Sequence, residues 1–171
     1  MRVMLDTNVL ISALLFPSQH MDKLFEKIFT EHTVVLSTYI IDELYRVCKR
    51  KFDAKLVDID NLLANMNYEL VYTPHNIEEV LVDIRDQKDY PILHTAILED
   101  IDVLITGDKD FLDIDIDKPL IFTPHEFVNN YDEILAIISL VGELNSGHQS
   151  GEEEGWLLHD EVEAYFARKF K

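Results

Sequence analysis

The chain has 171 residues, of which 47% are hydrophobic, and 33 acidic against 15 basic residues give it a net charge of −18. This length and apolar content predict a globular domain with a substantial core and exclude a disordered chain. The strong negative charge is the opposite of the basic footprint typical of nucleic-acid-binding proteins.

Neither a membrane span nor a secretory signal is predicted. No apolar run approaches the roughly 20 residues that a transmembrane helix needs, and Met1-Arg2 leads directly into an apolar strand pattern. The single Cys48 can form no internal disulfide and falls on an apolar helical pattern, so we expect it to be a small core residue. These features predict a cytoplasmic protein without membrane contact.

Short apolar runs alternate with helical patterns along most of the chain. Strands are predicted at residues 2–6, 33–37, 68–72, 103–105 and 120–122. Helices are predicted at residues 9–16, 20–31, 39–51, 56–66, from about 89 onward, and at 124–130. Thr38 is the expected N-cap of the third helix, and Pro91 suits the first turn of the fifth. This alternation predicts right-handed βαβ units and a parallel sheet.

The character of the sequence changes after Tyr131. Residues 133–144 form an apolar helical pattern, residues 145–155 (NSGHQSGEEEG) are polar, and residues 156–171 return to amphipathic helical periodicity. We therefore expect a folded domain at 1–144, a linker at 145–155 and a C-terminal amphipathic helix at 156–171. A solitary helix of this length is marginal in water, so it should dock on this domain, a second copy or a partner.

Acidic residues follow two of the predicted strands. The stretch DVLITGDKDF is a short buried strand that ends at Thr106-Gly107 and is followed by Asp108 and Asp110. RVMLD is a second such strand, and it ends in Asp6. Ligands of open parallel sheets bind outside the carboxyl ends of the strands. Neighbouring carboxylates repel there unless one holds a proton or a cation binds.

Two further acids complete a possible metal site. Glu43 lies about one turn inside the helix after the second strand, and Asp89 lies at the head of the fifth helix. Mg²⁺ and Mn²⁺ prefer oxygen ligands, mainly carboxylates and water. Metal-bound water can supply hydroxide near neutral pH, while the cation neutralises charge that develops on a phosphoryl group. The four acids therefore fit hydrolysis of a phosphodiester.

The segments MLDTNVLISAL, the Glu43 helix, RDQKDYPILHTAI and DVLITGDKDF together resemble the PIN domain family over residues 1–131. The family is the metal-dependent ribonuclease fold of many prokaryotic toxin–antitoxin toxins. The resemblance implies an α/β fold of three layers, α/β/α, with a central parallel sheet of about five strands. To this core the chain adds a C-terminal helical extension.

The resemblance also implies a function and its residues. A PIN-like chain is expected to cleave single-stranded RNA with Mg²⁺ or Mn²⁺, to be held inactive by an antitoxin, and to form a homodimer. The implied catalytic and metal-binding quartet is Asp6, Glu43, Asp89 and Asp108, with Asp110 as a further metal ligand. Asn8 and Thr106 match polar positions that support the site in relatives.

Each acid taken alone also has a purely structural interpretation. Asp6 could cap the following helix, Asp89 could be an N-cap with Asp86 as its rival for the metal, and Asp110 could bond the turn backbone. Glu43 alone would be a solvated helix residue. Only the combination of these acids favours a site.

Alternative functions remain open from the sequence. One is a catalytically weak PIN-like domain that serves as a protein-binding or Mg²⁺-dependent signalling module. Another is a phosphatase with a nucleophilic aspartate, but Asn8 stands where its second acid belongs. The C-terminal helix either packs or masks the site in cis through Arg168 and Lys169, as an antitoxin would; a packing role is favoured because apolar helical stripes usually pack.

Overall fold

The computed structural model describes residues 1–74, 90–112, 114 and 116–140. The chain divides into two compact units, Met1–Tyr131 and Asp132–Lys171. Asp89 and its rival Asp86, the predicted linker at 145–155 and the predicted C-terminal helix at 156–171 lie outside the described residues. Among the helices that are described, none is long and apolar enough to cross a membrane.

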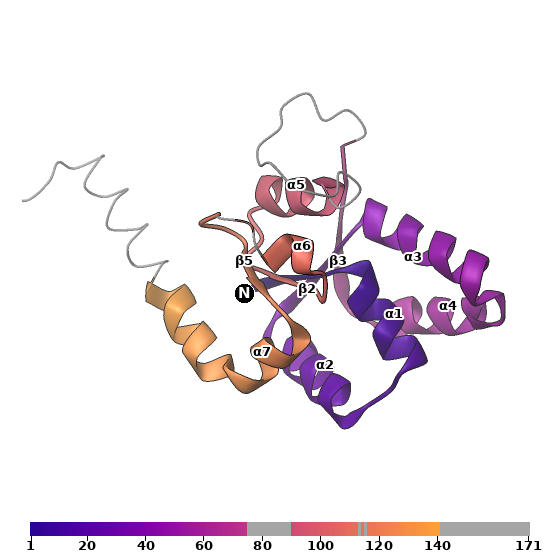
Figure 1. Ribbon diagram of the computed structural model, residues 1–171, viewed down its shortest axis with the longest axis horizontal. Helices are drawn as coiled ribbons and strands as arrows, with labels where there is room; N and C mark the ends of the chain where they lie inside the picture. The colour runs from indigo at the N-terminus through magenta and orange to yellow at the C-terminus, as the bar shows by residue number, and fades with distance from the viewer. Residues whose placement is uncertain (75–89, 113, 115, 141–171) are drawn as a thin grey trace, which may run out of the picture. The chain divides into compact units, whose positions relative to one another are not determined.

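A parallel sheet of five strands forms the centre of the first unit (Figure 1). The strands are β1 (Arg2–Leu5), β2 (Thr33–Ser37), β3 (Tyr68–Val71), β4 (Val103–Ile105) and β5 (Leu120–Phe122). Their order across the sheet is β3-β2-β1-β4-β5. The chain therefore leaves the centre in one direction through β2 and β3 and in the other through β4 and β5. This arrangement places a crevice outside the carboxyl ends of β1 and β4.

Helices flank the sheet and give the predicted three-layer α/β/α fold (Figure 1). They are α1 (Thr7–Leu15), α2 (Gln19–Glu31), α3 (Thr38–Lys51), η1 (a 3-10 turn, Asp53–Lys55), α4 (Leu56–Asn65), α5 (Tyr90–Leu98), α6 (Lys109–Leu112) and α7 (Pro124–Asn129). Helix α1 packs against α3, and α2 packs against α7. Residues 131–140 are helical as well, so this helix begins two residues before the predicted helix at 133–144; residues 141–144 lie outside the described part.

The core lies on both faces of the three central strands. Every residue of β4 and residues 3–5 of β1 and 34–37 of β2 are buried. Strands covered on both faces need continuous rather than alternating apolar runs, which explains the sequences VML, VVL and VLI. Cys48 is also buried, as expected for a small core residue.

One local prediction is wrong, and one short helix was not predicted. Ser37, not Thr38, caps α3, because the Ser37 hydroxyl accepts from the N–H of Ile40 at 3.2 Å. The Thr38 hydroxyl instead accepts from the N–H of Thr73 at 3.0 Å and ties α3 to the end of β3. Helix α6 was not predicted, since four residues are too few to show a helical period.

Candidate functional site

Asp6 and Thr106 lie side by side where β1 and β4 end. Leu5 pairs with Ile105 in the parallel register, and the N–H of Asp6 donates to the carbonyl of Ile105 at 3.0 Å. The next residue of each strand is therefore carried to the same edge of the sheet. Parallel pairing thus brings together two segments that are 100 residues apart in the chain.

The hydroxyl of Thr106 links the two strand-end acids. It donates to Oδ2 of Asp6 at 2.8 Å and accepts from the N–H of Asp108 at 3.0 Å. Thr106 is fully buried, so water does not compete for these bonds. One hydroxyl therefore fixes the Asp6 carboxylate and the turn that carries Asp108.

Asp6 is a buried carboxylate whose proton affinity is increased. Its side chain is 2% exposed, and burial raises its pKa to about 6, with the charge of Glu43 contributing in the same direction. The hydrogen bond from Thr106 and the nearby N–H groups of Thr7 and Asn8 lower the pKa of Asp6 and so offset part of the increase. Asp6 occupies the N-cap position of α1, where its side chain makes no capping hydrogen bond.

Glu43 reaches the same region from α3. Oε2 of Glu43 accepts from the hydroxyl of Thr7 at 2.8 Å, and Thr7 is the first residue of α1, directly after Asp6. Thr7 is itself buried. Helices α1 and α3 pack together, and this bond holds the Glu43 carboxylate near Asp6, as the electrostatic coupling of the two acids also indicates.

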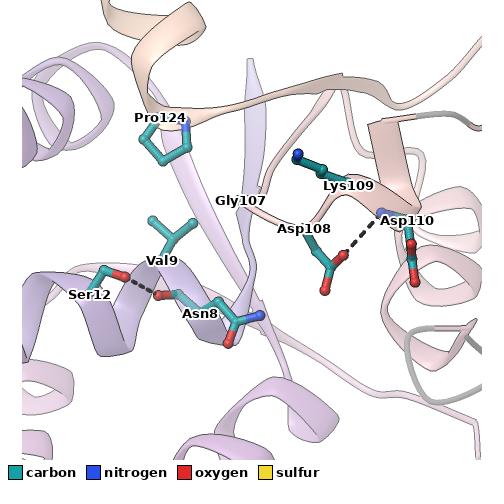
Figure 2. Close-up of a pocket in the computed structure, with 8 residues that line it drawn as sticks. All are labelled: Asn8, Val9, Ser12, Gly107, Asp108, Lys109, Asp110 and Pro124. Carbon is teal, nitrogen blue, oxygen red and sulfur yellow. Dashed lines mark hydrogen bonds between the residues drawn. The ribbon is translucent and has the colours of Figure 1, made fainter.

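Asp110 and Asn8 lie next to the two strand-end acids. The N–H of Asp110, in the first turn of α6, donates to Oδ1 of Asp108 at 3.0 Å (Figure 2). The side-chain amide of Asn8 lies 3.5 Å from Oδ2 of Asp6, the outer limit for a hydrogen bond. Both residues thus lie beside the acids that they were predicted to accompany.

A pocket of about 650 Å³ opens beside these groups. Figure 2 shows Asn8 and Asp108 with their polar ends turned toward each other across it. Its lining residues are Asn8, Val9, Ser12, Gly107, Asp108, Lys109, Asp110 and Pro124. A volume between about 300 and 1,000 Å³ is usual for sites that hold small ligands, so the pocket can admit a group of nucleotide size.

The structure brings together most, but not all, of the predicted site. Asp6, Thr106 and Asp108 are joined directly, Asp110 follows Asp108, and Glu43 joins through Thr7. Asp89 lies outside the described residues. Within the described ranges, no three His, Cys, Asp or Glu side chains are grouped closely enough to hold a metal ion.

Sequence reasoning missed three residues of the site. Thr7 positions Glu43, and Ser12 and Lys109 line the pocket. The sequence held a signal for Thr7, which stands between two predicted site residues. Ser12 lies one helical turn after Asn8 and so shares its face, but nothing local marks that face as facing a pocket.

A comparison with known protein families identifies the family of this chain. A model of the PIN domain matches residues 2–110, which include both strand-end acids and Glu43. The chain belongs to the PIN domain family. This membership confirms the resemblance predicted from the sequence segments.

Two individual proteins resemble this PIN chain. The uncharacterized protein MJ1680 of Methanocaldococcus jannaschii is 29% identical over 150 residues, which span 79% of this chain and 94% of that protein. A chain in the crystal structure of VapBC2 from Rickettsia felis, bound to a DNA fragment from their promoter, superposes with a TM-score of 0.56 and 18% identity. That match covers 72% of this chain and 98% of the other, and at this identity it supports the shared PIN fold alone.

Proposed function

We propose that this PIN domain is a metal-dependent endoribonuclease that hydrolyses phosphodiester bonds of single-stranded RNA. The observation that carries the proposal is the pair of buried threonine hydroxyls at the carboxyl edge of the sheet, which bond the Asp6 carboxylate, the Glu43 carboxylate and the backbone N–H of Asp108. Membership of the PIN family supports the nuclease class, and the adjoining pocket supports a substrate of nucleotide size.

The donor set suits Mg²⁺ or Mn²⁺. Asp6 and Glu43 repel each other enough to help raise the pKa of Asp6, and a bound cation would remove this repulsion. Asp6, Glu43 and Asp108 are the described residues that would hold it, with Asp110 as a further ligand, and Asp89 is the fourth acid expected from the sequence. When bound, such a cation lowers the pKa of water and neutralises phosphoryl charge.

The protein's own groups prepare this reaction. Thr106 holds Asp6 and the Asp108 turn at fixed separation, and Thr7 fixes the Glu43 carboxylate. Such outer hydrogen bonds orient ligands and tune their basicity. The pocket beside Asp108 would receive a strand of RNA next to the acids, with Asn8 as a polar contact.

We further propose that the enzyme is the toxin of a toxin–antitoxin module and acts as a homodimer. A chain in the VapBC2 structure has this fold, and this supports a protein partner for the present chain. The net charge of −18 disfavours strong non-specific RNA binding. RNA would then be held mainly at the site itself, where a bound cation and the contacts of the pocket offset the repulsion between the RNA phosphates and the negative charge of the protein.

Metal-dependent cleavage of labelled single-stranded RNA by the full chain tests the proposal. Asp108→Asn should reduce the rate at least 100-fold in Mg²⁺ or Mn²⁺, since it removes a ligand carboxylate. The exposed Asp42→Asn on α3 is the matched control and should cleave at the parental rate. Equal cleavage by parent and Asp108→Asn would refute the assigned site.

Thermal melting separates an enzyme from a catalytically weak PIN domain. Mn²⁺ should raise the Tm of the parent by binding only the folded state, and Glu43→Gln should reduce this rise. Stabilisation by the metal without any RNA cleavage would favour the protein-binding or signalling alternative.

A further inference from the structure

The pocket beside the acids contains one basic side chain among its lining residues. Lys109 follows Asp108 directly, at the start of α6. Figure 2 shows its ammonium end turned toward the space bounded by Val9 and Pro124, away from the Asp110 carboxylate. In a chain with a net charge of −18, a phosphate that approaches Asp108 needs such a local positive charge.

Ser12 offers a complementary polar contact on the opposite wall. Its hydroxyl donates to the carbonyl of Asn8 at 2.7 Å, one turn earlier in α1 (Figure 2). Because a hydroxyl has one hydrogen and two lone pairs, the Ser12 oxygen is left as an acceptor. A ribose 2′-hydroxyl is a donor that could use it, and this hydroxyl is the group by which proteins distinguish RNA from DNA.

The remaining wall is apolar and held in place. Val9 is 2% exposed and Pro124 is the first residue of α7. The carbonyl of Pro124 accepts from Nε2 of His20 at 3.3 Å, which ties this wall to α2. Thr123 caps α7 in a capping box with Glu126. Apolar lining with a few polar groups that fix orientation is usual for a pocket that holds a ligand.

We propose that this pocket is a ribonucleotide subsite of the nuclease, in which the Lys109 ammonium binds a backbone phosphate and the Ser12 hydroxyl accepts from the ribose 2′-hydroxyl. The assignment rests on the proposed function. It makes Lys109 and Ser12 substrate-binding residues, distinct from the acids that would hold the metal.

Direct binding tests the subsite without any need for cleavage. The full chain is titrated against a fluorescein-labelled single-stranded RNA and the DNA of the same sequence, in EDTA, over a range of salt concentrations. Lys109→Gln should weaken RNA binding roughly 3- to 10-fold and lower the salt slope by about 0.7, one phosphate contact on a single strand. Lys109→Arg should restore both. The matched control is Lys51→Gln at the exposed end of α3, which removes the same charge outside the pocket and should leave the slope unchanged.

Ser12→Ala tests the ribose contact. It should weaken RNA binding but not DNA binding, so the ratio of the two affinities should fall toward one. Equal RNA affinity and salt slope in the parent and Lys109→Gln, or an unchanged ratio in Ser12→Ala, would overturn the subsite.

The cleavage assay keeps the two proposals apart. If the parent cleaves RNA with metal while Lys109→Gln has parental KM, the subsite fails and the nuclease assignment stands. If the parent does not cleave but binds RNA through Lys109, the nuclease assignment fails and the subsite stands. For an active parent, Lys109→Gln should raise KM several-fold with kcat within about two-fold, as expected for a residue that binds substrate.

Discussion

At the scale of single residues, two buried threonines organise the site. Thr106 and Thr7 each donate to a carboxylate, so every carboxylate that they hold has a fixed orientation. Threonines serve this purpose because the hydroxyl bonds while the methyl group packs in the apolar interior. The same burial leaves Asp6 with a raised pKa, and a buried acid at a strand end therefore costs stability when it is ionised.

The first prediction concerns this cost. The pKa of Asp6 is raised from 3.8 to about 6 in the folded chain, so the folded state holds the proton more tightly than the unfolded state. Asp6 therefore lowers stability progressively as pH rises from about 4 to 6, and the loss is complete above that range. Asp6→Asn removes this loss of stability because the amide does not ionise. In metal-free buffer the variant should be more stable than the parent by up to about 3 kcal/mol at pH 7.5.

Urea denaturation between pH 3.5 and 8 measures this difference. The two stability curves should converge below about pH 4, where the carboxyl is protonated in both states. The exposed Asp42→Asn should follow the parental curve throughout. A variant that is less stable than the parent at pH 7.5 would show that the Asp6 carboxylate stabilises the fold.

A second prediction concerns Thr7. Thr7→Val keeps the shape of the side chain but removes the hydroxyl that donates to Glu43 at 2.8 Å. Loss of an outer hydrogen bond to a metal ligand typically reduces activity or metal affinity by about 10- to 100-fold. We expect at least a 10-fold decrease in metal-dependent RNA cleavage. Thr7→Ser, which retains the hydroxyl, should recover most of the rate; equally poor cleavage by both variants would indicate a packing role instead.

At the scale of elements, helix caps decide where the site residues are placed. Side chains of Ser18, Ser37 and Thr123 cap α2, α3 and α7. Each follows a turn or a strand, where the chain must satisfy the free N–H groups of the first helical turn. The cap of α3 matters most for function, because this helix carries Glu43 to the end of β1.

A third prediction therefore addresses Ser37. Ser37→Ala removes the acceptor for the N–H of Ile40 in a fully buried position, and it should lower the free energy of unfolding by about 1 to 2 kcal/mol. Chemical denaturation measures this loss. Thr30→Ala, an exposed position inside α2, should be neutral or slightly stabilising because alanine favours helix interiors. A neutral effect at Ser37 would show that α3 is held by packing alone.

At the scale of the whole molecule, the chain extends beyond the PIN match, which ends at residue 110, and beyond the first compact unit, which ends at Tyr131. The predicted linker and C-terminal helix stay predictions, since they lie outside the described residues. If the predicted helix at 156–171 forms, its apolar positions need a surface on which to pack, and two proposals differ in what that surface is.

Truncation after Leu144 gives the fourth prediction. If the C-terminal segment packs on the domain or on a second copy, the shortened chain should melt lower or change its mass in solution without any gain in cleavage. If Arg168 and Lys169 mask the acids, the shortened chain should cleave RNA faster at unchanged mass. Light scattering and the cleavage assay on the same samples distinguish the two, and the packing result is the one we expect.

Hydrophobic patterning in the sequence was sufficient to predict the architecture and the ends of the strands. Continuous apolar runs of three to five residues are sufficient to predict buried parallel strands, and all five strands lie where they were predicted, to within a residue. Because parallel strands present their carboxyl ends at one edge, Asp6 and Asp108 could be placed together without coordinates. Membership of the PIN family could likewise be inferred from short segments.

The hydrogen bonds that hold those acids depend on contacts between distant parts of the chain. The Thr106–Asp6 bond joins residues 100 apart, and the Thr7–Glu43 bond joins residues 36 apart. Hydrophobic periodicity reports which face of an element is buried but not which distant side chain it meets there. The pKa of Asp6 and the pocket beside Lys109 result from contacts between residues that are distant in the sequence. Burial and electrostatic coupling depend on what packs around a group rather than on its neighbours in the chain.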